Sequence, residues 1–420
     1  MHIAFPIGSD TLGRMAERDT NAQPLEAARV AVIGAGTMGA GIAQVALEGG
    51  WRVALHDPLP GATDRALERI RRGLTRRAEK AGSAGPARYA SDRLLAIDVV
   101  GSAAAAVADA QLAIEAVVED LDVKRGLFRQ LDDAAPADAV LATNTSALSV
   151  STIAEAASRP ERVVGLHFFN PAPVLPLVEV VAGRASAPWA VERAAGIVEG
   201  WGKTPIRVTD APGFIVNRVN RPFTLEPLRL LRAGASTIEA IDAAIVAEGF
   251  PMGPFALMDL IGIDVNLAAA RGLFEASGRP PRFRPSPIQE ELVSAGRLGR
   301  KTGEGFYRYV EGRAVGPAAR FIDRSGGPAR AGGIDPGTIA ERVILAIVNE
   351  AYRALGDAVA GEDDIDQAMR LGANHPFGPF EWTRRTGLHE VVVMLDALSD
   401  EDADTFRPTL PLLRSARAGI

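Results

Sequence analysis

The chain has 420 residues, a formal net charge of −6 at pH 7 and no cysteine. The lack of cysteine excludes disulfides, thiolate catalysis and cysteine-based metal sites, and the five histidines have no helical metal-binding spacing, so no metal is expected. The acidic balance without a long basic block argues against a nucleic-acid partner, and no apolar run is long enough to span a bilayer, so we expect a cytoplasmic protein without a membrane partner.

The first half of the chain alternates short β-branched runs with longer Ala-rich stretches. Residues 1–27 lack the ordered features of a signal peptide, and we interpret them as an N-terminal tail. Strands are expected at residues 29–33, 52–56, 112–117, 139–142, 162–166, 178–181 and 206–208, with a helix at 37–47. Strands separated by helices indicate a mainly parallel sheet with right-handed crossovers. We therefore predict an α/β domain of the Rossmann type over residues 28–210.

A charge-rich helical stretch interrupts this pattern at residues 65–80 and ends at the breaker cluster 82–86. On composition alone, the simplest interpretation is a solvated helical arm.

The character of the sequence changes after residue 213, where strand signals largely disappear. Residues 214–231 and 237–247 are typical of helices, and residues 311–336 have the Gly, Pro, Ala and Arg content of a linker. Helices resume near residue 338.

Two motifs of the first helical block recur in the second, in the same order. Ile241–Ile245 is similar to Ile365–Met369, and Pro251–Phe255 is similar to Pro376–Phe380. The offsets are 365 − 241 = 124 and 376 − 251 = 125, which a single-residue indel explains. We therefore predict two repeated all-α domains, at residues 211–310 and 337–420, joined by the linker 311–336.

The segment VAVIGAGTMGAG, from residue 30 to residue 41, has the glycine spacing of a dinucleotide-binding loop between a strand and a helix. Gly34 would permit the tight turn, Gly36 the close approach of a pyrophosphate, and Gly39 the close packing of helix on strand. The helix N-terminus at Thr37 and Met38 would offer N–H groups and a positive dipole end to the phosphates.

Asp57 ends the next strand, 57 − 36 = 21 residues after Gly36. A carboxylate at this position hydrogen-bonds a ribose 2′-hydroxyl and repels a 2′-phosphate, so NAD is favoured over NADP. FAD shares the fingerprint but no later FAD-type signature follows, and a glycine turn without a ligand is the remaining alternative. The loop therefore predicts an NAD-binding domain.

His167 is the candidate base for removing the proton of an alcohol during hydride transfer. It follows the apolar residues 163–164, at the strand end where α/β folds place ligands, although a lone histidine there is more often a satisfied core residue. Glu179 interrupts the apolar run 177–181, and a buried acid is costly unless it is paired. Pairing with His167 would orient the ring and stabilise the imidazolium; the alternative is an edge-strand residue that faces water.

Asn144, Thr145 and Ser146 also follow an apolar strand. They would offer amide and hydroxyl groups to the same crevice, or serve only as a helix cap or turn.

These residues belong to a longer set of ordered motifs, and the chain resembles the L-3-hydroxyacyl-CoA dehydrogenase family, within it the 3-hydroxybutyryl-CoA dehydrogenases. The resemblance runs from about residue 28 to 310, with repeat similarity to about 390. The motifs are VAVIGAGTMGAGIAQ at 30–44, EAVVEDLDVKRGLF at 115–128, NTSALS at 144–149, GLHFFNPAPVLPLVEVV at 165–181, DAPGFIVNR at 210–218, GFPMGPFALMDLIGID at 249–264 and GRKTGEGFY at 299–307.

The resemblance assigns roles to individual residues. His167 matches the family's catalytic base and Glu179 its partner, while Ser146 and Asn217 match residues that contact the reacting part of the substrate. Near the cofactor, Glu119 and Lys124 match positions by the nicotinamide ribose, and Asn144 and Asn170 are expected close to the same pocket.

The resemblance implies reversible NAD-dependent oxidation of an (S)-3-hydroxyacyl-CoA, of the 3-hydroxybutyryl-CoA type, to the 3-ketoacyl-CoA. In the family the arm at residues 65–80 contacts coenzyme A, whose phosphates need cations. Two alternatives stay open: a dehydrogenase of the same fold for a free hydroxy acid such as L-gulonate or carnitine, and a non-catalytic NAD-binding protein. The complete set of Ser146, His167, Glu179 and Asn217 argues against the second alternative.

The second helical repeat bears on assembly. Single-repeat members of the family dimerise through the helical domain, and a second repeat in the same chain would occupy that surface. We therefore expect either a homodimer or a monomer in which repeat packs on repeat.

Overall fold

The structure is a computed structural model that describes residues 28–321 and 335–418. The predicted N-terminal tail, residues 1–27, lies outside the described residues, as do residues 322–334 of the predicted linker. Within the described ranges, no helix is long and apolar enough to cross a membrane.

One eight-stranded sheet forms the centre of the N-terminal part of the chain, in the order β3-β2-β1-β4-β5-β6-β7-β8. The strands are β1 (Arg29–Ile33), β2 (Arg52–His56), β3 (Ile97–Val99), β4 (Leu112–Glu115), β5 (Val140–Thr143), β6 (Val163–Phe168), β7 (Leu177–Ala182) and β8 (Thr204–Thr209). Every neighbouring pair is parallel except β6 and β7, which are antiparallel. The prediction of a mainly parallel Rossmann-type sheet is therefore confirmed, and the short strand β3 is an addition to it.

Helices cover both faces of this sheet, which explains why its central strands are continuously apolar. In β1, Val30 and Val32 face one layer, whereas Ala31 and Ile33 face the other. The first layer is built on α1 (Thr37–Glu48) and α7 (Pro188–Gly200), and the second on α4 (Ala103–Val107), α5 (Leu121–Ala134) and α6 (Val150–Ala154), with the 3₁₀ turn η2 (Pro160–Arg162) before β6.

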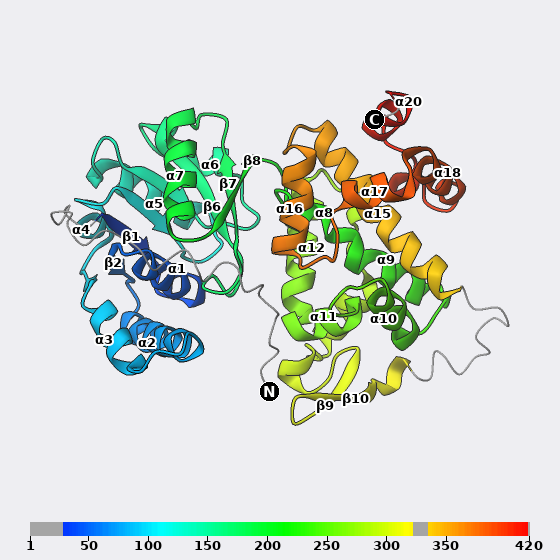
Figure 1. Cartoon of the computed structure of the whole chain (residues 1–420), viewed down its shortest axis with the longest axis horizontal. Coiled ribbons are helices and arrows are strands. Elements are labelled where there is room, and N and C mark those ends of the chain that lie inside the picture. Colours follow the sequence, from blue (N-terminus) through cyan, green and yellow to red (C-terminus); the bar gives the residue numbers. More distant parts are fainter. Residues whose placement is uncertain (1–27, 322–334, 419–420) are drawn as a thin grey trace.

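The charge-rich stretch forms the helix α2 (Ala62–Lys80), which pairs with α3 (Pro86–Leu94) as a hairpin beside α1 (Figure 1). Its buried side recurs every four residues, through Ala66, Ile70 and Leu74 among others, as a helix packed along one face requires. The arginines of the stretch are therefore left on the exposed face.

The rest of the chain is mostly helical and lies beside the sheet domain (Figure 1). Its first segment, residues 211–321, contains α8 (Val216–Val219), α9 (Arg221–Arg232), α10 (Ile238–Ala247), α11 (Pro254–Ile261), α12 (Ile263–Ala276), η3 (Pro281–Phe283), α13 (Pro287–Ser294) and η4 (Arg300–Thr302). Its second segment, residues 335–418, contains α15 (Pro336–Gly356), α16 (Glu362–Gly372), α17 (Pro379–Thr386), α18 (Leu388–Ser399), α19 (Ala403–Phe406) and α20 (Leu410–Ala418).

The structure differs from the all-helical expectation at the end of the first segment. An antiparallel hairpin forms there from β9 (Tyr307–Val310) and β10 (Arg313–Pro317), so the predicted linker begins with a strand. The glycine and proline content of residues 311–317 concealed this strand, because hairpin edges tolerate both residue types.

The two helical segments share one hydrophobic core, which also includes Val150, Leu177 and other residues of the sheet domain that pack against it. The long helix α15 packs against α9 and α10 of the first segment (Figure 1). The prediction of two repeated all-α domains is therefore not confirmed, because each segment buries its apolar face on the other and the two make one helical unit.

Local geometry nevertheless repeats at the recurring motifs. Asp242 accepts hydrogen bonds from the amides of Phe255 (2.9 Å) and Ala256 (3.1 Å) at the start of α11. Asp366 accepts from Phe380 (2.7 Å) and the next amide (2.8 Å) at the start of α17. The glycine before each helix lies against that carboxylate, since a Cβ at Gly253 or Gly378 would lie 2.3 or 2.2 Å from the Asp Cγ.

Buried ion pairs join the two segments. Arg342 Nε of the second segment lies 2.6 Å from Glu226 Oε1 of the first, and Arg218 Nε of the first lies 2.8 Å from Glu350 Oε1 of the second. Both glutamates are almost fully buried. The pairs are reciprocal, because 342 − 218 and 350 − 226 both equal 124, the offset of the recurring motif.

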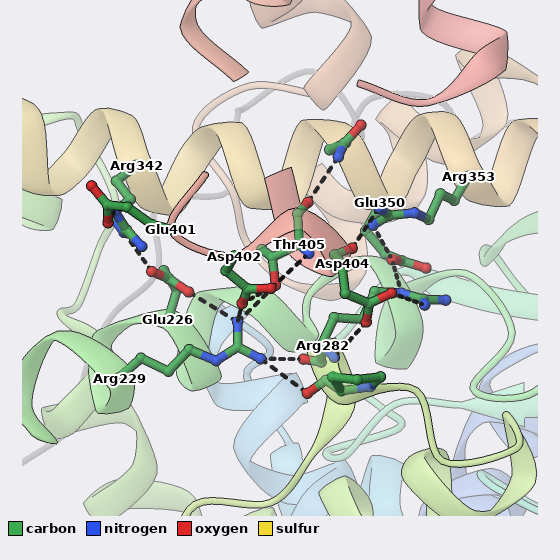
Figure 2. Close-up of polar contacts among 12 residues, drawn as sticks. Glu226, Arg229, Arg282, Arg342, Glu350, Arg353, Glu401, Asp402, Asp404 and Thr405 are labelled. Atoms are coloured by element: carbon green, nitrogen blue, oxygen red, sulfur yellow. Dashed lines mark hydrogen bonds and ion pairs between the residues drawn. The ribbon is translucent and has the colours of Figure 1, made fainter. Parts of the chain in front are cut away.

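A further arginine completes each pair within its own segment, as Figure 2 shows for both carboxylates. Arg229 Nη1 lies 3.0 Å from Glu226, and Arg353 Nη1 lies 3.3 Å from Glu350. Their numbers again differ by 353 − 229 = 124. The residues around α19 and η3 close the network, through contacts of Asp402, Asp404, Thr405 and Arg282.

Candidate active site

The polar residues singled out in the sequence lie at one edge of the sheet. Strands β1, β2, β4, β5 and β6 are parallel, so their carboxyl ends meet there. This edge is where open α/β sheets bind their ligands.

The glycine loop after β1 has the conformation that a dinucleotide requires. Gly34 has a φ of +104°, which only glycine adopts readily, and a Cβ on Gly39 would lie 1.8 Å from the Gly34 oxygen. A Cβ on Gly36, in contrast, would meet nothing within 4 Å, and no side chain caps the N-terminus of α1. Gly36 and Thr37 are exposed, so the loop and the first N–H groups of α1 can receive a pyrophosphate.

Asp57 lies at the end of β2, directly beside this loop. Its Oδ2 accepts a hydrogen bond from the amide of Ala35 (2.7 Å), and its Oδ1 accepts one from the amide of Leu59 (2.9 Å). Asp57 therefore braces the loop, and its oxygens keep lone pairs for ribose hydroxyls.

His167 and Glu179 lie opposite each other in the antiparallel pair β6–β7. His167 Nδ1 lies 2.6 Å from Glu179 Oε2, and both residues are buried. Within the described ranges, His167 Nε2 has no protein partner. The rings of Phe169 and Phe214 lie 4.4 and 5.8 Å from the imidazole, centroid to centroid, and hold it in place.

The second oxygen of Glu179 connects the sheet to the helical part. Glu179 Oε1 accepts hydrogen bonds from the amides of Ile215 (3.0 Å) and Val216 (2.9 Å), at the start of α8. Three donors thus share one buried carboxylate, which satisfies its lone pairs and fixes its orientation.

The loop after β5 brings the predicted substrate residues together. Asn144 Oδ1 accepts from the amide of Phe168 (2.9 Å), next to His167 in the chain. Asn217 Nδ2 donates to the backbone oxygen of Ser146 (3.2 Å), so α8 reaches the same loop. Ser146 itself is exposed at the edge of the sheet.

Glu119 and Lys124 form the base under this loop. Glu119 Oε1 accepts from the hydroxyl of Thr145 (2.6 Å) and the amide of Ser146 (2.9 Å). The Lys124 ammonium is 1% exposed and lies 2.6 Å from Glu115 and 3.2 Å from Glu119. Burial raises the pKa of Glu119, but the Lys124 charge and these hydrogen bonds outweigh it and lower the pKa below its usual value.

Two features of this edge differ from the expectations or extend them. Asn170 is exposed, and within the described residues its side chain forms no hydrogen bond with the other predicted site residues. Glu115, which the sequence reasoning passed over, is fully buried and binds both Lys124 and the Thr143 hydroxyl. Its signal resembled that of Glu179, because both are acids within a short apolar strand: Glu115 ends β4, whereas Glu179 lies inside β7.

The fold and the arrangement of this edge define a nicotinamide-dependent dehydrogenase. A model of the NAD binding domain of 3-hydroxyacyl-CoA dehydrogenases matches residues 29–211, and a model of the C-terminal domain of the same enzymes matches residues 213–309 and 337–418. The chain belongs to the 3-hydroxyacyl-CoA dehydrogenase family. It is therefore an oxidoreductase that uses NAD.

Individual relatives agree with this family. The chain is 37% identical to a 3-hydroxyadipyl-CoA dehydrogenase of Escherichia coli over 90% of its length and 95% of the relative's. It is 39% identical to the mitochondrial hydroxyacyl-coenzyme A dehydrogenase of Sus scrofa, over 67% of this chain and 90% of that protein. The crystal structure of a 3-hydroxybutyryl-CoA dehydrogenase from Escherichia coli K12 superimposes with a TM-score of 0.84 and 36% identity, covering 94% of this chain and 99% of that one.

Proposed function

We propose that this protein reversibly oxidises the 3-hydroxyl group of a short-chain (S)-3-hydroxyacyl-CoA, with His167 as the base. The observation that carries the proposal is the buried pair of His167 Nδ1 and Glu179 Oε2, 2.6 Å apart. Because Glu179 occupies Nδ1, the lone pair of Nε2 is directed away from it and is left for a substrate hydroxyl.

The residues of the edge have separable tasks in this reaction. His167 Nε2 takes the proton from the C3 hydroxyl, and Glu179 stabilises the resulting imidazolium and keeps the ring oriented. Ser146 and Asn217 hold the reacting oxygen and the adjoining carbonyl of the substrate. When bound, NAD accepts the hydride that leaves C3.

The residues around the glycine loop fit the cofactor. The amides of Gly36, Thr37 and Met38 would hold the pyrophosphate, while Gly34 and Gly39 shape the turn. Asp57 would bind the adenosine ribose. Near the nicotinamide ribose we propose Glu119, with Asn144 and Asn170 close to the same pocket, whereas the buried Lys124 acts by positioning Glu119.

The hairpin of α2 and α3 is our candidate for the coenzyme A site. The arginines Arg65, Arg69 and Arg76 are exposed on α2. In the described part of the chain they form no ion pair, whereas Arg71 and Arg72 are paired with Glu68. Guanidinium groups without a partner suit the phosphates of coenzyme A.

The test compares the two kinds of substrate that this fold serves. Acetoacetyl-CoA with NADH should be reduced, whereas L-gulonate and carnitine with NAD should give no turnover. A panel of acyl-CoA esters from four to sixteen carbons then measures kcat/KM against chain length, and we expect the maximum at the short end. Turnover of a free hydroxy acid without turnover of any CoA ester would overturn the proposal.

We further propose that the second helical segment is a duplicate of the first and that the chain is a monomer whose repeats pack on each other. The reciprocal pairs Arg218–Glu350 and Arg342–Glu226 support it, because exchange of equivalent contacts is the property of a two-fold interface. The shared offset of 124 residues extends to Arg229 and Arg353. In this proposal the pairing surface of a single-repeat enzyme is already filled within one chain.

A further inference from the structure

Arg221, the first residue of α9, carries a buried charge that no carboxylate neutralises. The residue is 6% exposed, and its Nε is buried without a hydrogen-bond partner. Its side chain forms no hydrogen bond or ion pair with any residue in the described ranges 28–321 and 335–418. Burial alone lowers the pKa of Arg221 to about 10, so it stays a cation at neutral pH.

The neighbouring arginines show how unusual this is. Arg218, three residues earlier, and Arg229, eight residues later, each lie on a buried glutamate, at 2.8 and 3.0 Å. A buried cation without a counter-charge is costly. A protein keeps such a group where a ligand supplies the missing charge.

The fold itself does not need a cation at this position. The offset of 124 that relates Arg218 to Arg342 and Arg229 to Arg353 relates Arg221 to Leu345 of α15. Leu345 is fully buried in the shared core. The equivalent position in the second segment, which has no active-site residue before it, is therefore occupied by an apolar side chain.

Arg221 is close in the chain to the proposed site. Asn220, which separates α8 from α9, has a right-handed helical conformation (φ −80°, ψ −7°), so Arg221 begins α9 four residues, about one helical turn or ~5.4 Å, after Asn217. Asn217 donates a hydrogen bond to the backbone oxygen of Ser146, in the substrate loop, so Arg221 begins its helix about one turn from a residue of the proposed site.

We infer, resting on the proposed function, that Arg221 binds a carboxylate at the far end of the acyl chain and selects dicarboxylic 3-hydroxyacyl-CoA substrates of about six carbons. In such an ester the distal carboxylate is three carbons beyond the reacting C3, roughly 4 Å away along an extended chain. An arginine one helical turn beyond Asn217 spans the remaining distance with its own side chain. The planar guanidinium binds a carboxylate with two parallel hydrogen bonds.

The experiment compares two six-carbon esters that differ only at the distal end. (S)-3-Hydroxyadipyl-CoA carries the carboxylate, and (S)-3-hydroxyhexanoyl-CoA carries a methyl group in its place. The wild-type enzyme should have the higher kcat/KM with the adipyl ester. Arg221→Leu, which copies the residue at position 345, should lower kcat/KM for the adipyl ester about 100-fold or more and leave the hexanoyl ester within about threefold.

Arg221→Lys serves as the conservative variant, because it keeps the charge but loses the two-pronged hydrogen bonding. It should recover part of the lost adipyl activity, and it replaces the leucine variant if that variant fails to fold. An equal loss with both esters, or a wild-type preference for the hexanoyl ester, would overturn this inference and leave the proposed function intact. Inactivity of the wild type with every CoA ester would overturn both.

Discussion

Glu179 is the side chain that connects the chemistry to the fold. It binds His167 with one oxygen and two amides of the helical part with the other. The same carboxylate thus orients the proposed base and closes the helical part onto the sheet. Its burial makes all three contacts strong, because the surrounding dielectric is low.

Glu179→Gln should lower kcat for acetoacetyl-CoA reduction by about 10²- to 10⁴-fold, since a neutral amide cannot stabilise the imidazolium. NADH affinity should stay within about threefold, because the glycine loop is untouched. The matched control is Glu155→Gln, an exposed carboxylate paired only with Arg184 at the surface. Equal kcat in wild type and Glu179→Gln would refute the assigned pair.

The glycines of the loop make a second contrast. At Gly39 an added methyl would lie 1.8 Å from the backbone oxygen of Gly34, whereas at Gly36 it would meet nothing within 4 Å. Gly39→Ala should therefore lower the melting temperature, while Gly36→Ala should keep the stability and weaken NADH binding by about tenfold or more. Thermal melts and NADH fluorescence titrations measure both. Undiminished NADH affinity in folded Gly36→Ala would contradict the placement of the pyrophosphate.

The role of a single residue could be predicted from the sequence where the residue type is unexpected among its neighbours in the chain. The acid Glu179 in an apolar strand and the spaced glycines gave such a signal. Glu115 gave the same signal and was passed over. Arg221 gave none, because in an arginine-rich stretch only the folded structure distinguishes a paired guanidinium from an unpaired one.

Among the elements, the start of α11 depends on a buried acid. Asp242 caps the helix through two amides and also accepts from the hydroxyl of Tyr307 (2.8 Å). Burial raises its pKa to about 6. In the unfolded chain the pKa of this carboxyl is about 3.9, so the folded chain binds the proton of Asp242 more tightly. The protonated carboxyl therefore stabilises the fold below about pH 4, and this stabilisation is lost as the pH rises through about 6.

Asp242→Asn should therefore cost more unfolding free energy at pH 4.5 than at pH 6.5, by about 1–3 kcal/mol, in addition to a capping loss of about 0.5–2 kcal/mol at both. Urea denaturation at the two pH values measures the difference. The exposed Asp138→Asn should cost little at either pH. A cost for Asp242→Asn that is larger at pH 6.5 would contradict this assignment.

Periodicity predicted most elements, including the strands at residues 29–33 and 52–56 with their observed ends. It failed where an element is short and has no buried residue. Strand β3 has three residues, and β10 contains both Gly316 and Pro317. Both are held by backbone pairing to a neighbouring strand, which leaves little trace in the sequence.

At the scale of the whole molecule, the helical part is a single unit in which two segments carry recurring motifs. The recurring motifs are visible in the sequence, but the shared core of the two segments is visible only in the structure. That property depends on which faces meet, and the buried pairs of Glu226 and Glu350 lie at this contact (Figure 2).

The full chain should accordingly sediment as a monomer, with one cooperative transition for the helical part. A fragment of residues 1–310 lacks α15 and leaves α9, α10 and the Glu226 carboxylate without their cover. It should dimerise or aggregate, which sedimentation velocity at several concentrations detects. A fragment that is monomeric and as stable as the full chain would contradict internal packing of the repeats.

In the proposed reaction, His167 exchanges the proton with the substrate oxygen. The turnover of acetoacetyl-CoA with NADH by the wild-type enzyme and by the His167→Gln variant tests this role most directly, with NADH binding measured on both. We expect the substitution to lower kcat by at least about 10²-fold while NADH still binds with its original affinity. Unchanged turnover in a folded His167→Gln variant would contradict it.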